Sequence, residues 1–201
     1  MSVISSLIAY FKIDVYNRFI ELVTAPYHHS ELLWITIPLI IVVLLMEFYF
    51  GRYRKEELGW NTAVGNALVL LFVAMDLYRH LYDLSPFKDF FNYVFLNARG
   101  VFIATIIALE GVWLLFANFY HILPKKFAFF TSASLQINMT AYVAIVLVYS
   151  NLELDLATII AAVILYFVLL GFFALIHLIE PKAKEALEIK EKTARELKEA
   201  Q

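Results

Sequence analysis

The chain has 201 residues, of which 62% are hydrophobic and 17% are charged, and its mean hydropathy is +0.75. A balance this apolar excludes an ordinary soluble domain and favours lipid as the main solvent. The net charge of -2 provides no basic field, so no nucleic-acid partner is predicted. Cysteine is absent, which excludes disulfides, thiolate metal sites and cysteine nucleophiles.

Residues 1–30 form the first predicted unit, an amphipathic segment. Apolar side chains recur at helical spacing between residues 3 and 23, while Lys12, Arg18 and Glu21 interrupt any run that could span a membrane. This pattern predicts a helix that lies in the membrane interface. We expect no cleaved signal peptide, because no basic region is followed by a short apolar core and a cleavage site.

Residues 31–180 form the second predicted unit, an all-helical membrane domain. Five of its segments are apolar enough to cross a bilayer core of about 30 Å, which takes roughly 20 helical residues. Glycine and proline residues separate these segments, and a helix satisfies its own backbone groups in lipid. The predicted spans are 31–50, 60–84, 101–123, 127–149 and 155–178.

A polar stripe runs along one face of the second span, 60–84. Asp76, Arg79, His80 and Asp83 lie three or four residues apart, so one helix face presents all four near its end. They form either a self-neutralised interfacial cap or the entrance of a transport pathway. The aromatic segment 85–100 that follows is predicted to be a second interfacial helix or a loop.

The third span carries the deepest ionisable side chain of the chain, Glu110. It lies nine residues beyond Val101, about 14 Å along a helix and therefore near the bilayer centre. A carboxyl group at that depth is suited to carry protons or to coordinate a cation. Asn118 and His121 return to nearly the same helix face and extend a polar line toward the cytoplasm. Glu47, near the end of the first span, is instead expected to reach water.

Polar side chains occupy two faces of the fourth span, 127–149. One face carries Gln136 with a serine and a threonine, and another carries Asn138 with a serine. This span is therefore expected to be surrounded by protein or by a water-filled cavity, whereas the first and last spans are expected to face lipid. Because Gln136 and Asn138 fall at the depth of Glu110, they are its predicted partners.

Residues 181–201 form the third predicted unit, a charged helix. The segment is either a solvated extension or a weak coiled-coil helix that docks a partner. Eleven of the 16 Lys and Arg residues fall on the side of the C-terminus if five spans are counted. The positive-inside rule then predicts a protein of the plasma membrane with its N-terminus outside and its C-terminus in the cytoplasm. The Lys- and Glu-rich tail is typical of thermophilic prokaryotes.

These observations lead to three functional hypotheses. A bundle this small has little room for a cavity enclosed by one chain, so a homo-oligomer or membership of a larger membrane complex is expected. The leading hypothesis is a channel or transporter subunit that moves protons, a cation or a small solute. A noncatalytic membrane scaffold is the alternative, and a membrane enzyme subunit with histidine-ligated haem is the third. No catalytic motif and no cofactor are predicted, and the sequence leaves any metal site open. The predicted pathway residues are Asp76, Arg79, His80, Glu110, Gln136, Asn138, Asn118 and His121.

Overall fold

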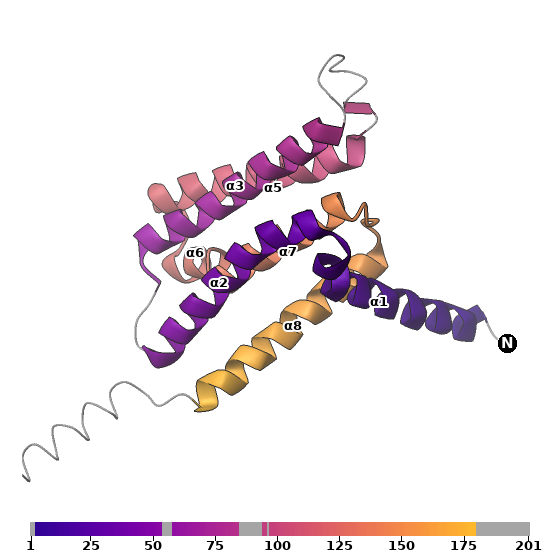
Figure 1. Cartoon of the computed structure of the whole chain (residues 1–201). Helices are drawn as coiled ribbons and strands as arrows, with labels where there is room; N and C mark the ends of the chain where they lie inside the picture. Colours follow the sequence, from indigo (N-terminus) through magenta and orange to yellow (C-terminus); the bar gives the residue numbers. More distant parts are fainter. Residues whose placement is uncertain (1–2, 54–57, 85–93, 96, 180–201) are drawn as a thin grey trace, which may run out of the picture.

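The computed structural model describes residues 3–53, 58–84, 94–95 and 97–179, and every long regular element within them is a helix (Figure 1). The aromatic segment 85–100 lies largely outside the described residues, and the charged tail 181–201 lies entirely outside them. In chain order, the helices are α1 (Val3–His28), α2 (Ser30–Arg52), α3 (Trp60–Leu84), α5 (Ala98–Phe119), α6 (Lys125–Thr131), α7 (Ser134–Tyr149) and α8 (Leu156–Ile179).

Four of these helices, α2, α3, α5 and α8, are long and apolar enough to cross a membrane. The pair α6 and α7, bent by 40°, makes a fifth span if the two are counted together. The predicted all-helical architecture is confirmed, and four or five of its helical segments are long and apolar enough to span a membrane. Helix α1 continues five residues past its predicted end, and its placement in the membrane interface stays a prediction.

The continuous helix predicted over 127–149 is wrong, because the chain is interrupted between α6 and α7. Ser132 ends α6, and Ala133 is extended with ψ of 150°. Asn66 of α3 donates to the Ser132 carbonyl oxygen at 2.8 Å, and Asn118 of α5 donates to the Ser132 hydroxyl at 2.7 Å. A backbone group freed by a break inside a span needs such a partner, which Asn66 supplies here, while Asn118 holds the side chain of the same serine.

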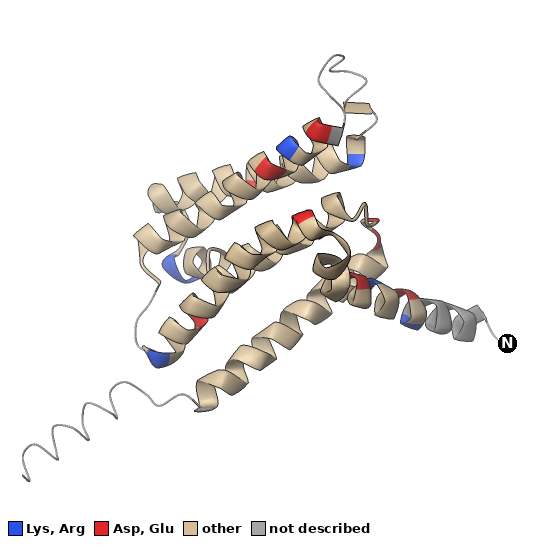
Figure 2. Ribbon diagram, viewed as in Figure 1, with Lys and Arg blue, Asp and Glu red and all other residues tan. Residues whose placement is uncertain are grey.

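Helix α7 occupies the middle of the bundle, with the α3/α5 pair on one side and α2 and α8 around the rest (Figure 1). Twelve of its 16 residues are buried. The spans α2 and α8 are the least covered: 17% of an 18-residue apolar stretch is buried in each, against 39% in α3 and 33% in α5. Helix α8 contains no Lys, Arg, Asp or Glu, and the charged residues lie mainly toward helix ends (Figure 2). The expected contrast between a surrounded fourth span and exposed first and last spans is therefore confirmed.

Helices α3 and α5 pack closely because a glycine faces the contact. A Cβ atom placed on Gly111 would lie 2.9 Å from Leu71 Cδ2 and 3.1 Å from Leu70 Cβ, so any side chain there would force these leucines of α3 to shift. Small residues that admit a neighbouring backbone are a common basis of helix association in membranes. A hydrogen bond of 2.6 Å between the hydroxyls of Tyr78 and Thr105 adds a polar contact between the same two helices.

Helix α1 is tied to α7 at a proline. Pro26 lies inside α1 and has no N–H, so the carbonyl oxygen of Leu22, four residues earlier, has no helical donor. The hydroxyl of Tyr142 on α7 donates to that carbonyl oxygen. The contact satisfies a backbone group that the sequence of α1 leaves free, and it fixes α1 against the central helix.

The start of α8 is capped by Asp155, which also holds α1. Its carboxylate accepts the N–H of Thr158 at 2.7 Å, an N-cap interaction, and a guanidinium N–H of Arg18 at 3.2 Å. Partial burial alone would raise the pKa of Asp155, but the hydrogen bonds from Thr158 and Arg18 outweigh it and hold the pKa below its ordinary value.

Candidate functional site

The predicted entrance residues on α3 form a compact cluster with α7. Asp76 accepts hydrogen bonds from Arg79 at 2.7 Å and from the hydroxyl of Tyr149 at 2.7 Å. Arg79 also lies 3.8 Å from Asp83, a looser ion pair. The carboxylate of Asp76 is therefore compensated by one cation and one hydroxyl donor. We call Asp76, Arg79, His80 and Tyr149 the Asp76 cluster.

His80 connects the Asp76 cluster to a third helix. Its ring stacks on Tyr149 with 3.8 Å between ring centroids and 18° between the planes. Its Nδ1 lies 3.6 Å from a carboxylate oxygen of Glu31 at the start of α2. The start of α2 and the ends of α3 and α7 thus meet through side chains that are far apart in the sequence.

A cavity of about 560 Å³ with both polar and apolar side chains in its wall adjoins the Asp76 cluster. His80 and Tyr149 form part of its wall, and Arg99 and Asn151 form another part. Arg99 donates a hydrogen bond to the side-chain oxygen of Asn151. A partly polar space of this size can hold water or a small solute next to the cluster.

Asn118, predicted to lie on the line from Glu110, is fully buried at the interruption between α6 and α7. Its amide nitrogen donates to the hydroxyl of Ser132 at 2.7 Å and lies 3.5 Å from the carbonyl oxygen of Ala63. Its amide oxygen has no hydrogen-bond partner among the described residues. Asn118 therefore joins α3, α5 and the broken span, and one acceptor remains unused.

His121 lies beyond the end of α5 rather than on its face. The helix ends at Phe119, and His121 adopts a left-handed φ of 53°. Its N–H reaches the carbonyl of Asn118, and the N–H of Ile122 reaches that of Ala117, which together form a Schellman cap. The His121 ring packs on Trp60 with 4.0 Å between centroids. The prediction that His121 shares a helix face with Glu110 is therefore wrong, because α5 ends before His121.

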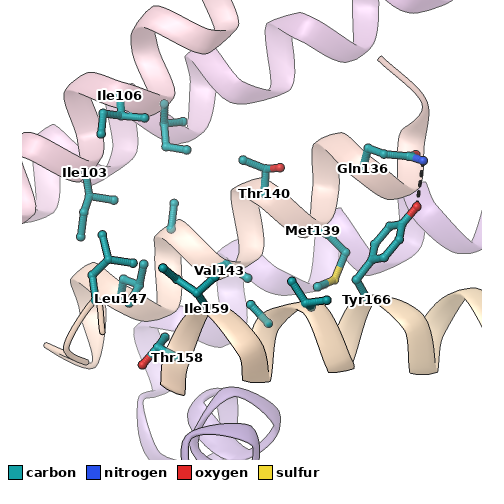
Figure 3. Close-up of a pocket in the computed structure, with 15 residues that line it drawn as sticks. Ile103, Ile106, Gln136, Met139, Thr140, Val143, Leu147, Thr158, Ile159 and Tyr166 are labelled. Carbon is teal, nitrogen blue, oxygen red and sulfur yellow. Dashed lines mark hydrogen bonds between the residues drawn. The ribbon is translucent and has the colours of Figure 1, made fainter. Parts of the chain in front are cut away.

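Glu110 is half-buried on α5, one helical turn beyond the residues of α5 that line a groove between α5, α7 and α8 (Figure 3). This α5/α8 groove, of about 430 Å³, is lined by apolar side chains such as Ile106 and Ile107 and by the polar side chains of Gln136 and Thr140. Glu110 lies three and four residues past these two isoleucines, so it shares their helix face. Within the described part of the chain, no hydrogen bond or ion pair reaches its carboxyl group.

Gln136 and Asn138, the predicted partners of Glu110, lie on different sides of α7. Gln136 faces the α5/α8 groove and donates to the hydroxyl of Tyr166 at 3.0 Å (Figure 3), and its amide oxygen is unpartnered among the described residues. Asn138 borders a second cavity between α1, α2, α7 and α8, which we call the α2/α8 cavity. It donates to the carbonyl oxygen of Ser134 at 2.8 Å. Of the two, only Gln136 lines the α5/α8 groove.

Three residues that complete these contacts were not predicted from the sequence: Asn66, Tyr149 and Tyr166. Asn66 supports the interruption of the fourth span, Tyr149 completes the Asp76 cluster, and Tyr166 accepts from Gln136. Asn66 could have been noticed as an amide inside an apolar span, which needs a partner in lipid. The two tyrosines carried no such signal, because tyrosine is common in apolar segments of this chain.

No three His, Asp or Glu side chains in the described part of the chain lie close enough together to hold a metal ion. No known family model matches the sequence, no curated protein matches it, and no solved structure matches it. The class of protein therefore follows from the helices themselves. They are compatible with insertion in a membrane as a multi-pass, all-helical protein.

Proposed function

We propose that this chain is a subunit of a membrane channel or transporter that moves protons or a small cation, with Glu110 as the group that binds and releases the moving species. The observation that carries the proposal is a half-buried carboxyl group, without a partner among the described residues, in the middle part of a helix that is apolar enough to span a membrane. Ionisable side chains in such segments are costly, and they commonly mark ion or proton pathways.

The chemistry of the groove supports a positively charged species rather than an anion. Glu110 offers carboxylate oxygens, and Gln136, which lines the groove, has an amide oxygen with no donor among the described residues. Oxygen acceptors of this kind are suited to a proton, a hydrated proton or a cation that prefers oxygen ligands. The interrupted span that carries Gln136 adds support, because broken helices border the binding sites of many transporters.

In this proposal the path has a polar region at each end. The Asp76 cluster and its cavity stand at one end, and Asn118 and His121 stand at the other. We place the protein in the plasma membrane with the Asp76 cluster outside and the C-terminus in the cytoplasm, as the distribution of Lys and Arg favours. Apolar side chains beside Glu110, such as Leu109 and Trp113, are exposed on one chain, so a second copy would be needed to enclose the path.

The test is flux in liposomes that contain the purified full-length protein. Proton and potassium flux are measured for the wild type and for Glu110→Gln, which removes the charge and keeps the shape. The matched control is Glu47→Gln, because Glu47 is also a half-buried carboxyl group in a span but lies 3.7 Å from His177. We expect at least a tenfold loss of flux for Glu110→Gln and less than a twofold change for Glu47→Gln, with the assembly size unchanged.

A noncatalytic scaffold is the second candidate, and a specific observation favours it. The polar contacts at Asp76 and at Asn118 each join three or more helical elements, as expected of residues that hold a bundle together. Absence of flux in the wild type, together with an altered assembly size for Glu110→Gln, would favour the scaffold over transport.

A further inference from the structure

Helix α5 carries two polar side chains without partners, Glu110 and Trp113. Within the described part of the chain, no hydrogen bond or ion pair reaches the Glu110 carboxyl group, and no hydrogen bond or ring contact reaches the Trp113 indole. Glu110 is half-buried and Trp113 is 55% exposed. Both lie within Ala98–Phe119, a candidate membrane span, where lipid tails offer neither a donor nor an acceptor.

The two side chains are complementary in their hydrogen-bonding chemistry. An indole N–H only donates, and a carboxyl group has an acceptor oxygen whether or not it holds a proton. A tryptophan N–H that is removed from water usually has an acceptor, and an ionisable group inside a membrane usually faces protein. One copy of the chain leaves both requirements unmet.

Ile106 lies between Glu110 and Trp113 on the surface of α5. At about 100° per residue, Glu110 lies about 40° to one side of Ile106, and Trp113 lies about 20° to the other side. Ile106 is 44% exposed, so this side of α5 is open. We call Ile106, Glu110 and Trp113 the Glu110 face. Along the helix axis, Glu110 and Trp113 are about 4.5 Å apart, a difference that two long side chains can span.

A two-fold axis beside Ile106 brings the two groups together. Copies of a membrane protein that insert with the same orientation pack in parallel about an axis normal to the membrane. In such a contact, a residue on one side of the axis meets the residue on the other flank of the partner's helix. Glu110 of one copy therefore faces the partner's Trp113, and the reciprocal pair forms as well.

We propose that the chain forms a dimer through the Glu110 face, in which the Trp113 indole of each copy donates to the Glu110 carboxyl group of the partner. Lipid tails on this face leave a donor and an acceptor unpaired, whereas a second copy pairs both. Ile106 also lines the α5/α8 groove, so the partner covers part of its open side. This inference deepens the proposed function, because it rests on the same Glu110 and names the partner that encloses the path.

Disulfide crosslinking of the full-length protein in liposomes tests the position of the axis. The chain has no cysteine, so each variant carries a single one. Ile106→Cys lies next to the axis and should crosslink to itself on oxidation with copper phenanthroline. The matched controls are Val112→Cys, about 120° around α5 from Ile106, and Val168→Cys on α8. Their exposed fractions of 40% and 52% bracket that of Ile106, and we expect each to give at least fivefold less dimer.

Energy transfer between copies labelled at the N-terminus with donor or acceptor dyes measures association as the ratio of protein to lipid is varied. Trp113→Phe keeps a ring and removes the N–H, so it should weaken association at least threefold. Glu110→Leu should do the same by removal of the acceptor, whereas Glu110→Gln keeps an acceptor oxygen and should change association by less than twofold. The control is Trp34→Phe, at a tryptophan that is 78% exposed on α2, and it should have no effect. The double variant Trp113→Phe/Glu110→Leu should associate no more weakly than the weaker single variant, since both changes remove the same contact.

Two results would overturn the dimer: crosslinking of Ile106→Cys that does not exceed the controls, or association of Trp113→Phe that equals that of Trp34→Phe. Flux is a separate readout. A dimer without flux contradicts the proposed transport and leaves this contact standing, whereas flux from a protein that stays monomeric contradicts the dimer alone.

Discussion

The central helix α7 and the peripheral helix α8 show how this chain distributes its polarity. Helix α7 contains serine, glutamine, asparagine and threonine residues, and 12 of its 16 residues are buried. Helix α8 is the most apolar candidate span and contains no Lys, Arg, Asp or Glu. Only 17% of its 18-residue apolar stretch is buried. In a water-soluble protein the more apolar helix would be expected inside.

The difference is the one expected of a bundle that is surrounded by lipid. Lipid tails are as apolar as leucine, so burial of α8 would gain little, whereas the polar side chains of α7 need protein partners. Hydrogen bonds from Asn138 to Ser134 and from Gln136 to Tyr166 show two ways in which those needs are met. The most apolar helix therefore faces outward and the more polar one lies in the centre.

The largest expected effect comes from removal of packing in α7 compared with α8. Ile145 is 0% exposed and Ile164 is 41% exposed. Ile145→Ala should lower the free energy of unfolding by about 2 kcal/mol or more, because the lost contacts leave a cavity. Ile164→Ala, the matched control, should change it by less than about 0.5 kcal/mol. Reversible unfolding in mixed detergent micelles, followed by circular dichroism, measures both. A large loss for Ile164→Ala would mean that another protein surface covers α8.

A smaller effect is expected at the contact between α7 and α1. Tyr142→Phe leaves the carbonyl oxygen of Leu22 without a donor, since Pro26 provides none, and should cost about 1–3 kcal/mol of unfolding free energy. In a Pro26→Ala background the cost should shrink, because the new backbone N–H can serve that carbonyl. A double-mutant cycle measures the coupling, and Tyr16→Phe, at an exposed tyrosine, is the control. Additive effects would show that the two residues act independently.

The smallest effect is the pH dependence of the α8 N-cap. The folded pKa of Asp155 is lowered, so its carboxylate stabilises the fold above the unfolded pKa of about 3.9, and this contribution is lost as the pH falls through the folded pKa. The Asp155 side chain is 41% exposed, so screening keeps the contribution small. The difference in unfolding temperature between wild type and Asp155→Asn should be constant from pH 7 to about 4 and should diminish below that. A difference that grows on acidification would contradict the assignment.

Much of the architecture could be predicted from the chain, because hydropathy over roughly 20 residues reports directly on membrane insertion. The bounds of α2 and α3 agree with the predicted spans to within two residues. The end of α5 was predicted too late, since the sequence signal at Pro124 lies beyond the Schellman cap at His121. The interruption at Ser132 could not be predicted, because it depends on amide donors from two other helices.

The candidate site was predicted in part. Asp76 and Arg79 are neighbours on α3, so their contact follows from helical spacing alone. Tyr149 reaches the same carboxylate from 73 residues away, and only the packing of α7 against α3 brings it there. Gln136 and Asn138 were predicted to lie at the depth of Glu110, but depth does not determine which side of α7 each residue faces, and they line different cavities.

The sequence by itself determined that this chain is helical, that four or five of its segments suit a membrane, and that Glu110 lies deep within one of them. These properties depend on local composition and on the helical repeat, which need no knowledge of neighbours. The tertiary structure decided where the fourth span breaks, which amide oxygens stay unpartnered, and which side chains share a cavity. Those properties depend on contacts between helices distant in sequence, so only their packing could establish them.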